Sequence, residues 1–264
     1  LSGDAARIKA GEYALTVGTT PLALLRTVVR GISIHHTITF VEGWTFRQIR
    51  QALTQVPRLR QSVADLTDAQ IMERLGFPAQ HPEGRFFPDT YHFSSGQTDL
   101  SVLANAHSAM RQYLDAAWLH RAPQLPYESP DEALIMASIV EKETGAAHER
   151  PAIAGVFVRR LRKNMRLQTD PTVIYGLGER FDGNLRRRDL REDTPYNTYV
   201  HKGLPPTPIA HPGGAAVDAA LHPLKGTALY FVAKGNGTHK FSDTYAQHKR
   251  AVALYQLKRK GTGS

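Results

Sequence analysis

The sequence predicts an α+β fold, in which a small strand–helix–strand module at residues 1–40 precedes a mixed α+β domain with a central buried helix. Strand-like alternation and helix-capping signals follow one another within residues 1–40. The stretch 133–140 is apolar on nearly every face, which an internal helix requires. Near the C-terminal end, apolar runs flank Gly235, Asn236 and Gly237, a pattern typical of a β-hairpin. A chain of 264 residues can bury a large core around these elements.

The formal charge of the chain is +9, which favours an anionic partner: nucleic acid, anionic lipid or an acidic cell-wall polymer. No zinc-finger spacing or glycine-rich RNA-binding signature accompanies the basic residues, so we expect no nucleic-acid partner. There is no cysteine and no metal-binding or phosphate-binding motif, so we expect no metal and no cofactor. The sequence starts at a leucine inside a structured pattern, and we expect its natural N-terminus to be missing.

The first module should contain a strand at residues 8–15, a helix that starts at Thr20 and Pro21 and ends at Gly31, and a strand at residues 32–40. His35 and His36 are adjacent in the second strand and point to opposite faces, so they do not form a metal pair.

Three further helices should follow. Thr45 caps a helix through Leu53, and Thr67 with Gln70 forms a capping box for a helix that Gly76 ends. An amphipathic helix should span residues 100–119. The loop at 78–88 leads into an aromatic cluster at 83–91, which could fill the edge of a core or form a platform for a sugar.

The central helix should begin at Ser129 and Pro130, with Glu132 completing a capping box and Gly145 as its terminator. Two glutamates, Glu141 and Glu143, lie in its last turn. Glu143 continues the row of Met136, Ile139 and Val140, while Glu141 continues the row of Leu134, Ala137 and Ser138. Either carboxylate could point inward, where burial and the helix dipole would raise its pKa and suit it to general-acid catalysis. Alternatively, both are solvated and paired with Lys142 or Arg150.

The rest of the chain should begin with a helix that has an apolar stripe and a basic outer face. The stripe consists of Ile153, Val156, Phe157 and Leu161. A strand at 165–169 should be broken by Asp170 and Pro171, with a short helical turn ending at Gly176. Residues 196–208 lack periodicity and should form a loop that lines a groove. The hairpin at 229–241 and a final helix at 243–260 complete the chain.

Two long motifs then narrow the function. Residues 136–144 read MASIVEKET, and residues 166–176 read RLQTDPTVIYG. Together they closely resemble the MltG (YceG-like) endolytic murein transglycosylase family. Shorter matches occur at 83–84, 87–90, 196–199, 203–206 and in the hairpin at 230–241, so the resemblance covers almost the whole chain.

This resemblance implies a bacterial inner-membrane protein with one N-terminal transmembrane helix, which would precede this sequence, and a catalytic domain in the periplasm. Residues 1–40 would be the C-terminal part of a LysM-like module, and residues 41–264 the YceG-like catalytic domain. The substrate would be the glycan strands of peptidoglycan, with peptidoglycan synthases as protein partners. The catalytic glutamate of the family, the second in its EKE motif, falls on Glu143.

A lytic transglycosylase needs only one carboxyl group, because the 6-hydroxyl of the sugar itself replaces water as the nucleophile. We expect Glu143 to act as acid and then base, with Gln168, Asp170, Tyr196 and Asn197 binding the substrate. Asp170 could equally be only a turn residue before Pro171. One alternative is a lysozyme-like hydrolase with Asp170 or Glu141 as its second carboxylate. Others are a non-catalytic wall-binding module and a basic nucleic-acid binder.

Overall fold

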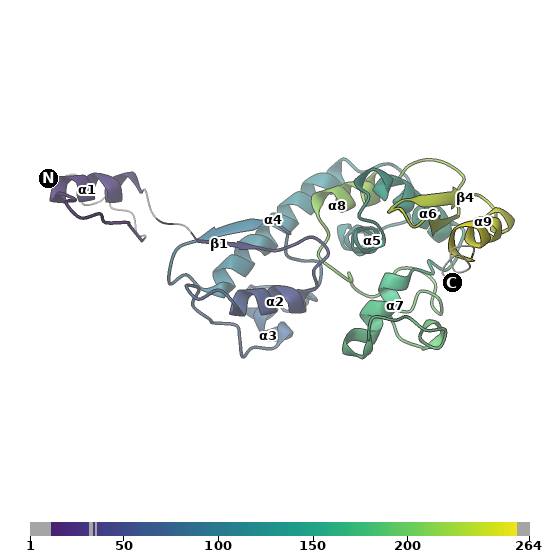
Figure 1. Cartoon of the computed structure of the whole chain (residues 1–264), viewed down its shortest axis with the longest axis horizontal. Helices are drawn as coiled ribbons and strands as arrows, with labels where there is room; N and C mark the ends of the chain where they lie inside the picture. Colours follow the sequence, from purple (N-terminus) through teal and green to yellow (C-terminus); the bar gives the residue numbers. More distant parts are fainter. Residues whose placement is uncertain (1–11, 32–33, 35, 258–264) are drawn as a thin grey trace, which may run out of the picture.

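A computed structural model describes residues 12–31, 34 and 36–257 of the chain and shows a mixed α+β fold. Helix α1 (Pro21–Arg30) lies at one end of the elongated molecule, apart from the other helices (Figure 1). It begins at Thr20, whose hydroxyl accepts the N–H of Ala23, and ends at Gly31 in the left-handed conformation, as the sequence predicts. An antiparallel bridge joins Glu12 to Ile34 beside it. Of the two strands expected around this helix, residues 8–11, 32–33 and 35 lie outside the described part of the chain.

Strand β1 (His36–Thr39) pairs antiparallel with β2 (Thr90–Phe93), in a register that places His36 opposite Phe93 and Thr39 opposite Thr90. The pairing therefore joins residues on both sides of the boundary expected at residue 40. The sequence of residues 32–40 could not reveal this pairing, because the partner strand β2 lies far along the chain.

Helices α2 (Phe46–Thr54), α3 (Asp68–Arg74) and α4 (Asp99–Leu119) lie in the same region as this strand pair (Figure 1). The capping boxes of Thr45 with Gln48 and of Thr67 with Gln70 are both present. Phe86 is fully buried and stacks on Phe46 with ring centroids 5.0 Å apart. This part of the aromatic cluster therefore fills a core and is not available as a sugar platform.

Helix α5 (Pro130–Glu143) is the central buried helix that the sequence predicts. Every residue from Ala133 to Val140 is buried, and the helix packs against α6 (Arg150–Arg162), α8 (Gly214–Leu221) and α4. Its ends differ in detail from the prediction. Glu132 accepts the N–H of Glu128 rather than that of Ser129, and the chain leaves the helix at an extended Thr144 without a positive φ at Gly145.

The C-terminal half contains mostly short elements. Residues 165–169 form no strand, and Gln168 adopts the left-handed conformation with φ +52°. Helix α7 (Asp170–Leu177) is longer than the expected turn and ends at Gly178. The remaining elements are the short 3₁₀ turns η2 (Ala147–Glu149), η3 (Gly178–Arg180) and η4 (Asp189–Arg191), the hairpin strands β3 (Tyr230–Ala233) and β4 (His239–Ser242), and α9 (Tyr245–Val252), continued by a π-helical turn at Ala253–Leu257. Residues 258–260 of the expected final helix lie outside the described part.

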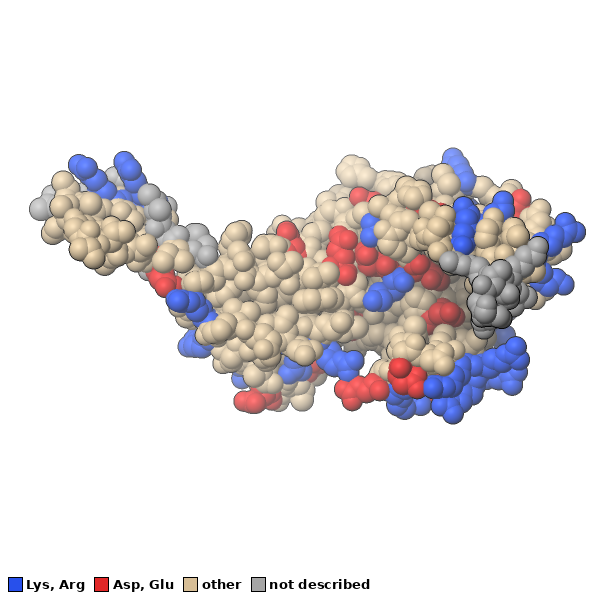
Figure 2. All heavy atoms as spheres, viewed as in Figure 1, with Lys and Arg blue, Asp and Glu red and all other residues tan. Residues whose placement is uncertain are grey.

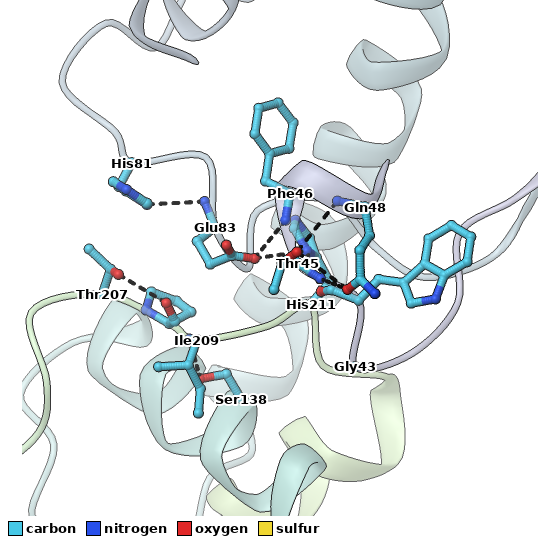
Figure 3. Close-up of polar contacts among 12 residues, drawn as sticks. Gly43, Thr45, Phe46, Gln48, His81, Glu83, Ser138, Thr207, Ile209 and His211 are labelled. Carbon is cyan, nitrogen blue, oxygen red and sulfur yellow. Dashed lines mark hydrogen bonds and ion pairs between the residues drawn. The ribbon is translucent and has the colours of Figure 1, made fainter. Parts of the chain in front are cut away.

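Buried polar contacts join the segment around Ile209 and His211 to α5 and to the start of α2 (Figure 3). The N–H of Ile209 donates to the Ser138 hydroxyl at 3.0 Å, which fixes the loop after residue 208 against α5. The Glu83 carboxylate accepts the N–H of Phe46 at 2.9 Å, at the start of α2, and lies 3.2 Å from Nδ1 of His211. Within the described residues, no helix is long and apolar enough to cross a membrane.

Replacing Ser138 by alanine should destabilise the protein by about 1–3 kcal/mol, because it leaves the buried N–H of Ile209 without a partner. Denaturant unfolding of the variant and of Ser95→Ala, which changes an exposed loop serine, measures the difference. The control should stay within about 0.5 kcal/mol of the parent protein. Equal stability of the two variants would show that the Ser138 bond contributes nothing.

Candidate active site

A cleft of about 490 Å³ lies at the C-terminal end of α5. Glu143, Gln168, Asp170 and Tyr199 line one part of it, and residues of the β3–β4 hairpin and α9 line the other. The space-filling view shows a hollow between the region of α7 and the region of α6, β4 and α9 (Figure 2). Lys and Arg side chains gather on the outer side of the α7 region.

Glu143 is the last residue of α5, and its half-buried carboxyl group accepts a hydrogen bond from the Thr169 hydroxyl at 2.8 Å. Burial raises the pKa of Glu143 to about 7, and the nearby negative charge of Asp170 acts in the same direction. The Thr169 hydrogen bond and the positive charge of Arg160 oppose this rise without cancelling it. The carboxyl group is therefore partly protonated near neutral pH, as a general acid must be.

Three buried threonines fix the segment that donates to Glu143. The N–H of Thr169 donates to the Thr198 hydroxyl at 3.1 Å, and the Thr198 and Thr172 hydroxyls lie 2.9 Å apart. The N–H of Gln168 donates to the carbonyl of Thr198 at 3.1 Å. This pairing holds Gln168 in the left-handed region, which non-glycine residues adopt at a cost, so its exposed side chain is placed at the cleft by its surroundings.

Asp170 lies in the cleft and is also the first residue of α7, so its position is compatible with both roles that the sequence left open. The Tyr199 hydroxyl donates to its carboxylate at 2.6 Å. Burial and this bond both raise the pKa of Tyr199, so its hydroxyl keeps its proton and remains a donor.

Arg160 lines the cleft, although the sequence prediction does not include it among the site residues. It is buried, its Nε donates to the carbonyl of Leu229 at 2.7 Å, and its Nη1 donates to that of Leu167 at 2.8 Å. Its position follows Val156 by four residues and Phe157 by three, which places it on the apolar stripe. That spacing was the available signal.

Tyr196 and Asn197 require a correction, because neither lines the cleft. Asn197 is fully buried; its Nδ2 donates to the carbonyls of Glu192 and Asp189, and its Oδ1 accepts the N–H of Tyr199. The Tyr196 hydroxyl bonds to that of Thr207 at 2.8 Å. The Asn197 side chain therefore stabilises the irregular loop and is not free to bind a sugar, and the Tyr196 hydroxyl is engaged outside the cleft.

Glu141 also points away from the cleft. Its carboxylate lies 3.2 Å from the Arg150 guanidinium and accepts the N–H of Gly213 at 3.0 Å, which matches the expected pairing with Arg150. Lys142 instead donates to the carbonyl of Gly43. Only Glu143, of the two glutamates, reaches the cleft.

A sequence model of the YceG-like family matches residues 1–254. The chain belongs to the YceG-like family. A relative from Bacillus subtilis (strain 168), named endolytic murein transglycosylase, is 35% identical over 273 residues, which cover 95% of this chain and 74% of the relative. A Streptococcus pneumoniae (D39) protein of the same name is 28% identical over 287 residues, which cover 93% of this chain and only 50% of that protein.

The solved structures contain the same fold. The 2.6 Å crystal structure of a yceG-like protein from Listeria monocytogenes superposes with a TM-score of 0.69 at 30% sequence identity. The match covers 94% of this chain and 86% of the Listeria chain. This YceG-like fold therefore extends through nearly all of the present sequence.

The raised pKa of Glu143 predicts a pH-dependent stability difference between the parent protein and Glu143→Gln. Because the pKa is about 7 in the folded state and near 4.5 unfolded, folding favours the protonated form, and the parent loses this stability as pH rises from 4.5 through 7. Relative to the glutamine variant, the parent should lose about 2–3 kcal/mol between about pH 4 and pH 8. Urea unfolding of both proteins at several pH values measures it. A difference that is constant with pH, or that grows in favour of the parent, would contradict the assignment.

Proposed function

We propose that this protein is an endolytic lytic transglycosylase that cleaves the MurNAc–GlcNAc bond of nascent peptidoglycan strands and leaves 1,6-anhydroMurNAc ends. The observation that carries the proposal is the Glu143 carboxyl group, half-buried in a cleft with its pKa raised to about 7. The names of the Bacillus and Streptococcus relatives support murein as the substrate.

Glu143 acts first as an acid and then as a base. Its proton passes to the glycosidic oxygen as the bond from that oxygen to C1 of MurNAc breaks. The 6-hydroxyl of the same MurNAc attacks C1, and its proton passes to the Glu143 carboxylate. The enzyme is thereby restored, and no water is consumed. This sequence requires one carboxyl group that is neutral when substrate binds and that can carry a charge briefly.

The other polar groups of the cleft suit the two stages. Gln168 and Asp170 are placed to bind hydroxyl and acetamido groups of the strand. The positive charge of Arg160 favours the carboxylate form of Glu143, which exists between the two proton transfers. The Thr169 hydroxyl, as a donor to Glu143, also favours that form.

The lysozyme-like hydrolase remains a second candidate on one observation, that Asp170 lies in the same cleft as Glu143. Glu141 is unsuited to the role of second carboxylate because Arg150 and the Gly213 N–H already engage it. The two reactions give products of different mass, because hydrolysis adds one water and anhydro formation adds none.

The wider setting of the protein forms part of the same proposal. Residues 1–40 would belong to a LysM-like module, which the Glu12–Ile34 bridge beside α1 supports, and residues 41–264 would form the catalytic domain. A transmembrane helix ahead of this sequence would hold the enzyme at the inner membrane, with the cleft in the periplasm. There it would end strand elongation near peptidoglycan synthases.

Replacing Glu143 by glutamine should lower the release of anhydro-ended fragments from purified peptidoglycan by about 10²- to 10⁴-fold, because the amide cannot supply the proton. Mass spectrometry of the soluble products gives both rate and product type. Glu141→Gln is the matched control from the same helix turn, and it should retain turnover within about tenfold once its melting temperature is taken into account. Turnover by Glu143→Gln at the parent rate would refute the mechanism, and products heavier by one water would favour the hydrolase.

A further inference from the structure

His239 and Glu149 form a pair at the hairpin side of the cleft, and neither has a part in the mechanism above. Nδ1 of His239 lies 2.7 Å from one oxygen of the Glu149 carboxylate, and the N–H of His239 donates to the other oxygen at 3.0 Å. Their side chains are 12% and 9% exposed. Glu149 ends the η2 turn, which directly follows the helix that carries Glu143, and His239 begins β4.

This contact fixes the proton of the imidazole. Burial alone would raise the pKa of Glu149, but the hydrogen bonds from the backbone and ring of His239 hold the pKa below its usual value. An ionised carboxylate can only accept hydrogen bonds, so Nδ1 of His239 must carry a hydrogen. In the neutral imidazole, Nε2 is then an unprotonated acceptor.

The ring is also fixed by packing. It meets Phe231 edge to face, with centroids 5.4 Å apart, and Phe231 meets the buried Phe157 at 5.7 Å in the same manner. His239 lines the cleft that contains Glu143. Among the residues that the structure describes, Nε2 of His239 has no hydrogen-bond partner, although it is not among the fully buried unpaired atoms.

We propose that His239 is a substrate-binding residue whose Nε2 accepts a hydrogen bond from a hydroxyl or acetamido N–H of the glycan strand, with Glu149 as the positioning residue that sets its tautomer. The inference rests on the proposed function, because it takes a glycan as the occupant of the cleft. It adds a contact from the hairpin to a cleft that Gln168 and Asp170 also line.

Anchoring of the hairpin alone does not account for the imidazole. Arg159 donates to the carbonyl of Ala228 and Arg160 to that of Leu229, each at 2.7 Å, so two arginines of α6 already hold the chain that enters β3. The backbone N–H of His239 provides a further bond to Glu149 that needs no ring. The Nε2 position, in contrast, has a role only if something enters the cleft.

Two substitutions separate substrate contact from anchoring. The amide nitrogen of His239→Asn can replace Nδ1 and donate to Glu149, but the variant has no acceptor at the Nε2 position. The longer His239→Gln places an amide oxygen near the Nε2 position and weakens the contact with Glu149. If His239 binds substrate, kcat/KM on defined glycan strands should fall about tenfold in the asparagine variant, mainly through KM, and at most about threefold in the glutamine variant.

The proposal would be overturned if kcat/KM fell more in the glutamine variant than in the asparagine variant, fell equally in both, or fell in neither. Because turnover also depends on folding, calorimetric binding of the same strands to Glu143→Gln with and without His239→Asn provides a second measurement, with an expected rise in Kd of about tenfold. His201→Asn is the matched control, because His201 pairs with Asp193 at 2.6 Å on an exposed surface outside the cleft, and it should leave both quantities unchanged. If the proposed function itself is wrong, Glu143→Gln alone will turn over glycan strands at the rate of the parent protein.

Discussion

The burial of one carboxyl group at the end of an internal helix is the constraint on which the rest of the site depends. The residues of α5 from Ala133 to Val140 are all buried, and Glu143, three residues later, lines the cleft where the helix ends. Loss of hydration outweighs the Thr169 hydrogen bond and the Arg160 charge, and the pKa rises to about 7. Glu141, two residues earlier, shows the contrast: it faces Arg150 and the Gly213 amide, and it plays no part in the cleft.

Neighbouring segments preserve this balance. The Thr198 carbonyl accepts the N–H of Gln168, and its hydroxyl accepts the N–H of Thr169. These bonds fix the backbone of Thr169, whose hydroxyl donates to Glu143. In the last turn of α7, the Tyr175 hydroxyl donates to Glu83 at 3.0 Å, and Glu83 in turn accepts the N–H of Phe46, the first residue of α2. Through the Tyr175 bond, the contacts around Glu83 and His211 (Figure 3) are therefore connected to the helix whose first residue, Asp170, lines the cleft with Glu143.

Local chemistry made much of this structure predictable. Capping residues located α1, α2, α3 and α5, the period of the apolar residues identified the buried helix, and two glycines around Asn236 indicated the hairpin. Contacts between distant segments were not predictable in this way. The pairing of β1 with β2 and the bond from Arg160 to the carbonyl of Leu229 depend on partners remote in sequence. The internal role of Asn197 depends on nearby partners, but these belong to an irregular loop that has no periodicity to reveal them. Motif membership placed Asn197 near the site but could not distinguish a side chain that binds substrate from one that supports the loop.

The most direct test of the account is the pKa of Glu143 itself, measured by NMR titration of protein labelled with ¹³C at the glutamate carboxyl carbons. Glu143→Gln assigns the signal, and Thr169→Val removes the hydrogen bond that favours the charged form. We expect a pKa of about 7 in the parent protein and a higher value in the valine variant. A parent value near 4.5, the ordinary value for a solvated glutamate, would contradict it.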